Sequence, residues 1–302
     1  GYVVGGTAWD FSNTARFERE QLDLLVVEEA GQFSLAPTIA ASVAARNLLL
    51  LGDPQQLPQV TQGIHPEPID TSALGFVADG EDVLPHALGY FLAQSWRMDP
   101  AVTAAVSDLS YAGQLHSAAA TNDRHLTGLA AGVHVLPVAH EGNATHSPEE
   151  AAAVVDIVRR VLDLEWTDPG TIVDGQPLDR HPLAQSDVIV VCPYNAHVAE
   201  VHAALHAAGL LDVRVGTVDK FQGQEAVVAI LSLAASSPTE APRGMSFLLM
   251  KNRLNVAISR AKWAAFLVHS PALTDYLPHT PAALAELSAF LRLLDRGVRE
   301  DA

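Results

Sequence analysis

Two places in the sequence put acidic and amide side chains directly after an apolar run. Glu28 and Glu29 follow one such run, and Asp53 and Gln56 follow the next. If each run is a buried strand, these side chains emerge at its carboxyl end, where open parallel sheets bind ligands. There, one carboxylate can hold Mg²⁺ through its water shell, the next can polarise an attacking water, and a glutamine can sense a terminal phosphate. The alternatives are exposed acids at a helix start and a Gly-Asp-Pro β-turn.

Charge is distributed unevenly along the chain. The net charge of −17 argues against a protein covered in nucleic-acid-binding surface. Between Arg214 and Lys262, however, seven basic side chains face three acidic ones, so this stretch is +4 and the remainder −21. An acidic body with one basic stretch fits a localised anion site, such as one for phosphates. A solvated basic face explains the charge pattern equally well.

The composition excludes several classes of protein. The chain has 302 residues, of which 49% are hydrophobic and 18% charged, so it is long enough and apolar enough to form about two packed domains. A single cysteine, Cys192, excludes a disulfide framework, a four-thiolate iron–sulfur cluster and a cysteine-built zinc site within this sequence. The histidines show no metal-site spacing, and His197, His202 and His206 are expected on a helix surface. There is no signal peptide and no apolar run near ~20 residues, which predicts a cytoplasmic protein without membrane contact.

The elements that must position these residues follow from the apolar runs. Continuous runs rich in β-branched residues are typical of strands buried on both faces of a parallel sheet. They occupy residues 2–4, 24–27, 48–51, 188–191, 213–215, 227–231 and 264–268. Helical patterns over 147–162 and 195–208 alternate with them, the first opened by a capping box and the second ended by Gly209. We therefore predict an α/β fold built from open, doubly wound parallel sheets.

The spacing of the strands divides the chain. About 135 residues separate two groups of strands, and a helical region is expected over 85–92 between them. We place a boundary near Ala93, which gives domains at 1–92 and 93–272, with a helical extension at 273–302. The first part is short for a complete doubly wound domain. Residues 163–183, rich in Asp, Pro and Gly, are expected to form a surface insertion.

The two strand ends, together with five further segments in a fixed order, resemble the motifs of superfamily 1 helicases. Residues 28–32 resemble motif II, and residues 52–58 resemble motif III. Residues 5–9 are similar to a motif that contacts strand phosphates, and residues 95–100 are similar to motif IV. Residues 191–196 are similar to the segment that meets the nucleic-acid strand. Residues 216–225 are similar to motif V, and residues 254–262 to motif VI. The branch most similar is the 5′-to-3′ translocating one, which includes nonsense-mediated-decay RNA helicases and replication nuclease-helicases. The resemblance implies two RecA-like domains with the P-loop NTPase fold, the first incomplete at its N-terminus.

The resemblance also implies roles in ATP hydrolysis. Glu28 matches the acid that holds Mg²⁺ through water, and Glu29 the acid that orients the attacking water. Gln56 matches the γ-phosphate sensor, and Arg97 and Arg260 match the arginines that reach the phosphates from the second domain. Arginine suits that role because its planar fork binds phosphate at two points and stays charged. The implied catalytic residues are Glu29, Gln56, Arg97 and Arg260, and the implied nucleotide-binding residues are Glu28, Asp53, Gln56, Arg97, Gly223, Glu225 and Arg260, with Glu225 accepting from the ribose.

A single nucleic-acid strand is the second implied ligand. The matching positions are Thr7, Pro193, Tyr194, Thr217 and Gln222. Tyr194 can stack on a base, although a tyrosine packed at a strand end is the alternative. Thr217 can bind a backbone phosphate or simply cap a helix. These contacts leave DNA versus RNA open, and the resemblance also allows a nuclease domain in the same full-length protein.

Two features depart from the family pattern. Hydrolysis needs a P-loop, Gly-x-x-x-x-Gly-Lys-[Ser/Thr], but none of the three lysines (Lys220, Lys251, Lys262) follows a glycine. The expectation is therefore a C-terminal fragment of a longer helicase, inactive alone. Glu28 stands where the family usually has aspartate, which puts the rate in doubt because Mg²⁺ tolerates poor geometry badly. The alternative is a non-catalytic nucleic-acid-binding module with relic motifs. The alanine-rich, lysine-poor composition suggests a bacterial source.

Overall fold

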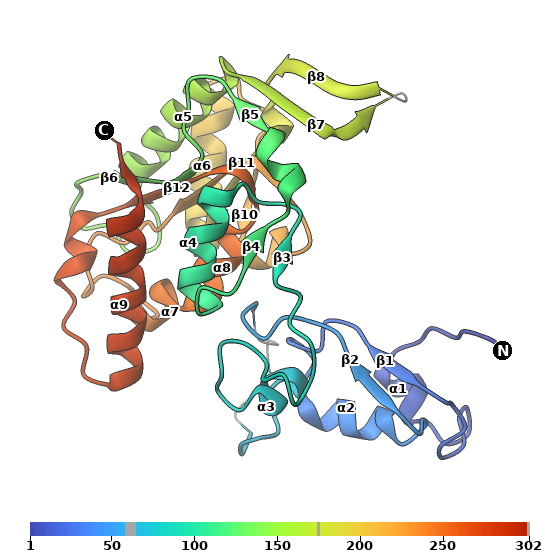
Figure 1. Cartoon of the computed structure of the whole chain (residues 1–302). Helices are drawn as coiled ribbons and strands as arrows, with labels where there is room; N and C mark the ends of the chain where they lie inside the picture. The colour runs from blue at the N-terminus through green and yellow to red at the C-terminus, as the bar shows by residue number, and fades with distance from the viewer. Residues whose placement is uncertain (58–64, 174–175, 301–302) are drawn as a thin grey trace. The chain divides into compact units, whose positions relative to one another are not determined.

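The chain divides into two compact units, Gly1–Phe91 (unit 1) and Leu92–Ala302 (unit 2). The computed structural model describes all residues except 58–64, 174–175 and 301–302 (Figure 1). Over these ranges no helix combines the length and the apolar character that crossing a membrane requires.

Unit 1 is a small α/β unit built on two short parallel strands. Its elements are α1 (Ala8–Ser12), β1 (Leu25–Val27), α2 (Leu35–Ser42), β2 (Leu48–Leu50) and α3 (Ala73–Ala78). Each residue of β1 pairs with one of β2, from Leu25 opposite Leu48 to Val27 opposite Leu50. One core cluster of this unit is small, with four buried members: Phe11, Leu25, Ala41 and Ala44. Buried apolar residues outside this cluster are Ala30, Leu57, Ala73, Leu74 and Ala78.

The expectation of strands buried on both faces is wrong for unit 1. Leu25 packs against Ala41 of α2, but the next residue along the strand, Val26, is 46% exposed, and Leu49 of β2 is 43% exposed. Successive side chains of a strand point to opposite faces, and here neither face is fully covered, because Leu48, opposite Leu25, is also 41% exposed. Residues 2–4, expected to be a third strand, have no strand partner among the described residues and form no strand.

Unit 2 contains a six-stranded, wholly parallel sheet, which confirms the predicted α/β class. The strand order is β10-β9-β11-β12-β6-β13. The strands are β6 (Gly132–Pro137), β9 (Val188–Cys192), β10 (Arg214–Thr217), β11 (Ala226–Ser232), β12 (Ala261–His269) and β13 (Val298–Arg299). Helices α4 (Pro100–Ser110), α8 (Lys251–Ile258) and α9 (Pro281–Arg296) contact one another and the sheet; α5 (Pro148–Leu162) and α6 (Asn195–Ala207) form a second packed group (Figure 1).

Some elements differ from the sequence expectations. The expected helix over 85–92 is wrong, because this segment, broken by Pro85 and Gly89, contains only turns. The segment 163–183 is more ordered than a simple insertion, since β7 (Glu165–Val173) and β8 (Gln176–Pro182) form an antiparallel hairpin that also pairs with β5 (His125–Leu126). Strands β3 (Gln94–Ser95) and β4 (His116–Ser117) pair as a small parallel sheet, and α7 (Met245–Leu249) precedes α8. Short 3-10 helices lie at Ala119–Asp123, Gln185–Asp187, Val218–Phe221 and Pro271–Asp275.

A buried polar network joins α5 and α6 to the carboxyl end of β11. Glu150 is fully buried, and its Oε2 accepts from the Ser232 hydroxyl at 2.6 Å and from the Ala234 amide at 2.9 Å. His197 Nδ1 accepts from the Ser147 amide at 3.3 Å, so Nε2 is the atom that donates to Ser232 Oγ, at 2.7 Å. The surface position expected for His197 is therefore wrong, because the ring is fully buried.

Candidate nucleotide and nucleic-acid sites

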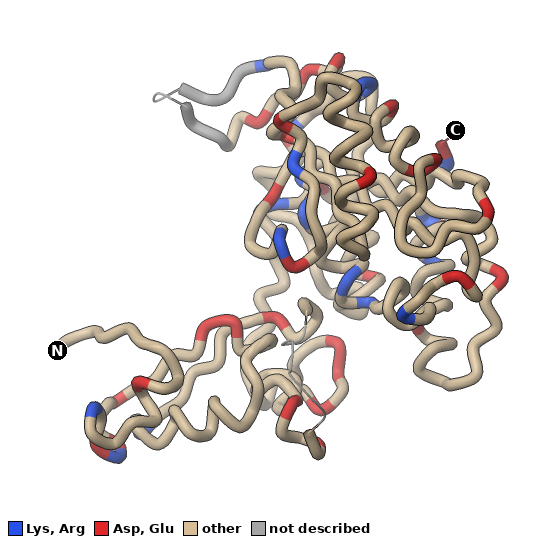
Figure 2. The backbone as a smooth tube through the Cα atoms, turned by 180° about the vertical axis from the view of Figure 1, so that it is seen from behind, with Lys and Arg blue, Asp and Glu red and all other residues tan. Residues whose placement is uncertain are grey.

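In unit 1 the strand ends bring the four predicted residues to one edge of the sheet. Glu28 and Glu29 follow β1 and are exposed (Figure 2 shows acidic residues in red). The turn that carries them is tied to the end of β2, since the Ala30 amide donates to the Leu51 carbonyl at 2.8 Å. Glu29 has a φ of +56°, the left-handed region that non-glycine residues rarely adopt. Such a conformation is typical of functional turns, where surrounding contacts hold the strain.

Two glycines allow the turns after β1 and β2 to pack backbone against backbone. A Cβ on Gly31 would lie 2.1 Å from the Asp53 carbonyl oxygen, and one on Gly52 would lie 2.7 Å from the Ala30 amide nitrogen. Glycine is therefore required at both positions. The side chains of Asp53 and Gln56 also interact, because Gln56 Nε2 donates to Asp53 Oδ2 at 3.2 Å.

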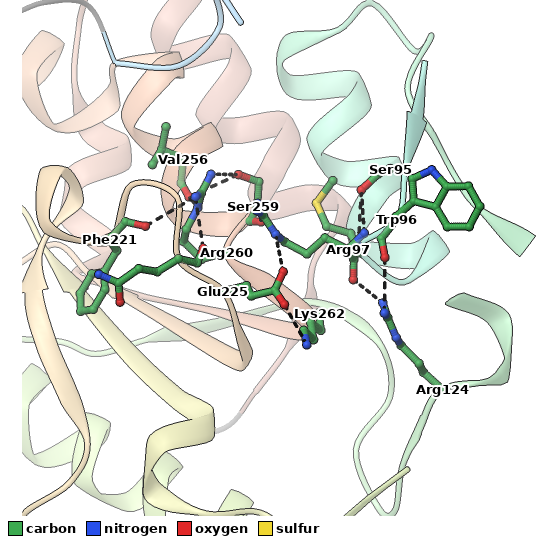
Figure 3. Close-up of polar contacts among 12 residues, drawn as sticks. Ser95, Trp96, Arg97, Arg124, Phe221, Glu225, Val256, Ser259, Arg260 and Lys262 are labelled. Atoms are coloured by element: carbon green, nitrogen blue, oxygen red, sulfur yellow. Dashed lines mark hydrogen bonds and ion pairs between the residues drawn. The ribbon is translucent and has the colours of Figure 1, made fainter. Parts of the chain in front are cut away.

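In unit 2 a charged cluster gathers at the amino ends of β11 and β12 (Figure 3). Arg97 Nε lies 3.0 Å from one carboxylate oxygen of Glu225, and Lys262 Nζ lies 2.9 Å from the other. Arg97 also donates through Nη1 to the Ser259 carbonyl at 3.1 Å. Glu225 directly precedes β11 and Lys262 is the second residue of β12, so the sheet itself aligns them. These residues lie at the amino ends of their strands, whereas the sequence led us to expect ligand residues at carboxyl ends, and their role stays a prediction.

The electrostatics of the cluster favour an ionised Glu225. Burial acts to raise the pKa of this carboxyl group, but hydrogen bonds and charge from Lys262 and then Arg97 outweigh it and lower the pKa. All three side chains keep part of their surface in solvent, with 45% exposed for Glu225 and 30% for Arg97. The cluster is thus a solvent-accessible arrangement of two cations around one anion, able to exchange partners with a ligand.

Arg260 lies inside unit 2. It is 3% exposed, and its guanidinium donates to the carbonyls of Val256 at 2.9 Å and Gln224 at 3.2 Å. The turn that it holds contains Gly223, whose φ of +74° requires glycine. In this structure, then, Arg260 fixes the turn that leads into Glu225. Contact with a phosphate, the role implied by the resemblance, would require Arg260 to release these carbonyls, and stays a prediction.

The residues predicted to contact a nucleic-acid strand are spread over both units. Thr7 caps α1 of unit 1, where its Oγ1 lies 2.7 Å from Asp10 Oδ2. In unit 2, Pro193 follows β9, and Thr217 ends the neighbouring β10, paired with Cys192. Gln222 is half-buried in the turn that follows.

Tyr194, predicted to stack on a base, is only 8% exposed and already stacks on Phe247, with ring centroids 5.5 Å apart. Its ring therefore matches the packed alternative more than the base-stacking one.

Three residues of unit 2 add to the site and were not among the predicted site residues. Lys262 completes the cluster around Glu225. Trp96 is 67% exposed and precedes Arg97, but its indole points away from Glu225 (Figure 3). Arg124 pairs with Asp168 at 3.0 Å and donates to the backbone carbonyls of Trp96 and Arg97. These contacts hold the backbone of residues 96–97, which precede α4. The spacing of Lys262 two residues after Arg260 was a usable signal, whereas Arg124 has none in the sequence.

Comparisons with known proteins agree on one kind of protein. The chain is 25% identical over 279 residues to the "DNA replication ATP-dependent helicase/nuclease DNA2" of Gallus gallus, which covers 91% of this chain and 26% of that protein. It is 45% identical over 80 residues to the "DNA polymerase alpha-associated DNA helicase A" of Schizosaccharomyces pombe, covering 26% of this chain and 12% of that protein. A family model described as an AAA domain matches residues 84–271, more than half of the chain. This chain is an AAA-domain member of the superfamily 1 helicases.

The family match covers most of unit 2 and thus the cluster around Glu225. A third relative, the "RNA helicase Mov10l1" of Homo sapiens, is 34% identical over 92 residues, 30% of this chain and 8% of that protein. This helicase chain therefore spans about a quarter or less of the length of these curated relatives. All three are eukaryotic, so they give no support to the bacterial source suggested by the composition.

Proposed function

We propose that the chain is the motor region of an ATP-dependent helicase or translocase that moves 5′ to 3′ along a single strand of DNA or RNA. The observation that carries the proposal is the cluster in unit 2. Arg97 and Glu225, 128 residues apart in sequence, form an ion pair beside Ser259 and Lys262. Arg97 and Lys262 are cations at a solvent-accessible edge of the sheet, and both pair with Glu225. A phosphate can replace Glu225 as their partner, so the cluster is suited to phosphate recognition.

The residues of unit 1 would supply the metal and water part of the reaction. Glu28 and Glu29 are exposed oxygen donors at a strand end, the chemistry that Mg²⁺ accepts through its water shell. When bound, Mg²⁺ would neutralise charge on the phosphates. Glu29 would orient the attacking water, with one of its oxygens already accepting from Gln32 Nε2 at 2.9 Å. Gln56, positioned by Asp53, would sense the terminal phosphate.

In unit 2, ligand binding would redistribute the ion pairs of Glu225. An arriving phosphate offers Arg97 a second anionic partner, and Glu225 would then be released to accept a hydrogen bond from a ribose hydroxyl. Lys262 keeps the carboxyl group ionised during this exchange. Arginine contacts of this kind are worth on the order of 10³–10⁵ in rate where they stabilise a phosphoryl-transfer transition state.

The proposal also includes an inactive isolated chain. The 302 residues contain no Gly-x-x-x-x-Gly-Lys-[Ser/Thr] sequence, so the amides and lysine that cradle the β- and γ-phosphates would have to come from residues outside this sequence. Within the same longer protein a nuclease domain is compatible with the helicase/nuclease name of one relative. If no P-loop accompanies the chain, a nucleic-acid-binding module with relic motor residues is the second candidate.

ATP hydrolysis by a longer form of the protein, extended upstream of Gly1, tests the proposal. We expect turnover that a single-stranded oligonucleotide stimulates, and we expect Glu29→Gln to lower it at least ~100-fold while ATP binding persists. Glu18→Gln, an exposed acid elsewhere in unit 1, is the matched control and should hydrolyse ATP like the wild type. Normal turnover by the Glu29 variant would remove its assigned role, and absence of hydrolysis with and without the strand would favour the binding module.

A further inference from the structure

Two arginines of unit 2 converge on one aromatic ring. The guanidinium carbon of Arg243 lies 3.7 Å from the centroid of Phe247, and that of Arg253 lies 3.9 Å from the same centroid. Arg243 precedes α7, where Gly244 has a φ of +76°, and Arg253 belongs to α8. Stacking on an aromatic face orients the planar guanidinium and leaves its edge N–H groups for another partner.

Neither guanidinium has that partner within the described part of the chain. Arg243 is exposed and makes no hydrogen bond or ion pair there, and the buried Nε of Arg253 has no acceptor. Burial lowers the pKa of Arg253, Arg243 lowers it further, and Asp219 and Tyr194 act in the opposite direction. Two neighbouring cations with one nearby carboxylate leave positive charge uncompensated in a chain whose net charge is −17.

The place of the pair in the fold points to its ligand. Phe247 also stacks on Tyr194, two residues beyond the end of β9, and Thr217 at the end of the adjacent β10 pairs with Cys192. The arginines therefore stand beside the carboxyl ends of two neighbouring strands at one side of the sheet. Because Tyr194 and Phe247 are both buried, the rings serve as a support for the arginines, and a base has no exposed ring face to stack on.

We propose that Arg243 and Arg253 bind a backbone phosphate of a single-stranded nucleic acid, with Phe247 and Tyr194 as positioning residues. The inference rests on the proposed function for its ligand class. Arginine on a fixed plane suits a phosphodiester because its fork donates to two oxygens at once. Such a contact adds affinity without reading sequence, as a translocating protein requires.

The salt dependence of strand binding tests the proposal. The 302-residue chain is titrated against a fluorescein-labelled oligo-dT by anisotropy over a series of salt concentrations. For each phosphate of a single strand that a variant no longer neutralises, the slope of log K against log salt becomes shallower by about 0.7. We expect this change when Arg243→Gln and Arg253→Gln are combined, part of it for either substitution alone, and less for Arg253→Lys, which keeps the charge without the planar group. Arg292→Gln, an exposed arginine on α9, is the matched control and should leave the slope unchanged.

The outcomes separate this site from the proposed function. A wild-type slope in the Arg243 and Arg253 variants, or an equally shallow slope in the Arg292 variant, overturns the site while strand binding stands. If ATP displaces the oligonucleotide, and the arginine variants weaken ATP binding instead, the anion is a nucleotide and the site for a strand is refuted. Absence of strand binding by the wild-type chain contradicts the proposed function, and the proposed site fails with it.

Discussion

The buried ring of His197 should make the stability of unit 2 depend on pH. Burial lowers the pKa of His197 to about 4, from an ordinary value of 6.5. Between pH 6.5 and 4, His197 is protonated in the unfolded chain but stays neutral in the folded chain. The free energy of unfolding therefore falls as the pH falls toward 4. A difference of this size corresponds to about 3 kcal/mol in full, and to about 2 kcal/mol at pH 5.

His197→Gln isolates this effect. A glutamine keeps a donor and an acceptor for Ser232 and Ser147 but cannot titrate. We expect the variant to be less stable than the wild type at pH 7.5, and the difference to shrink by about 2 kcal/mol at pH 5 because only the wild type is penalised there. His269, whose pKa burial also lowers, contributes equally to both proteins and cancels.

Urea unfolding at the two pH values measures the difference. The fluorescence of Trp166 and Trp263, which pack edge to face with centroids 5.9 Å apart, reports on unit 2. Val201→Ala, a fully buried residue on the same helix, is the control, since it destabilises without removing a titrating group. Its deficit should be the same at both pH values. A His197→Gln deficit that also stays constant, or that grows at pH 5, refutes the reasoning.

Two further substitutions test the supports of the candidate sites. Gly31→Ala would place a methyl group 2.1 Å from the Asp53 carbonyl oxygen, so we expect the turn after β1 to shift and unit 1 to become markedly more sensitive to limited proteolysis. Gly5→Ala, where the added methyl group meets nothing within 4 Å, is the control and should have a smaller effect. Arg124→Gln removes one partner of the buried Asp168, a hydrogen bond between charged groups, and should lower the free energy of unfolding by about 1.5–3 kcal/mol in urea titrations. An effect below ~1 kcal/mol would show that the pair does not hold residues 96–97.

Much of the parallel sheet could be predicted because its central strands are continuous apolar runs. The runs at 188–191 and 227–231 are β9 and β11, each buried on both faces by the two helix groups. The same pattern gave a wrong prediction in unit 1, where Val26 is exposed. A run of apolar residues predicts a strand buried on both faces, but it does not show whether another segment of the chain covers each face. Strand β6 was missed because His134 interrupts its apolar run, and the edge strand β13 was missed because it has only two residues, Val298 and Arg299.

The contacts of the candidate site were not predictable from the sequence, and the roles of its residues stay predictions. The resemblance implies that Arg97 and Glu225 both bind the nucleotide, and the structure shows in addition that they lie 3.0 Å apart. The burial of Arg260 and Tyr194 depends on segments far away in sequence, such as Phe247 under the tyrosine, so no local spacing could show it. Arg124 was missed for the same reason.

The turn between β10 and β11 connects the two kinds of candidate ligand. Thr217 at one end is a predicted strand contact, Glu225 at the other end is a predicted nucleotide contact, and Arg260 binds the carbonyl of Gln224 between them. Buried Arg260 thus holds the second half of this segment, through the carbonyls of Phe221 at 3.5 Å and Gln224 at 3.2 Å. If the proposed function is right, an arginine that stays on these carbonyls would serve the motor by keeping the nucleotide end and the strand end of this turn in a fixed relation. Arg260→Lys, which cannot satisfy both Val256 and Gln224 through a planar fork, should then lower strand stimulation of ATP hydrolysis more than basal hydrolysis, measured in the longer form of the protein extended upstream of Gly1.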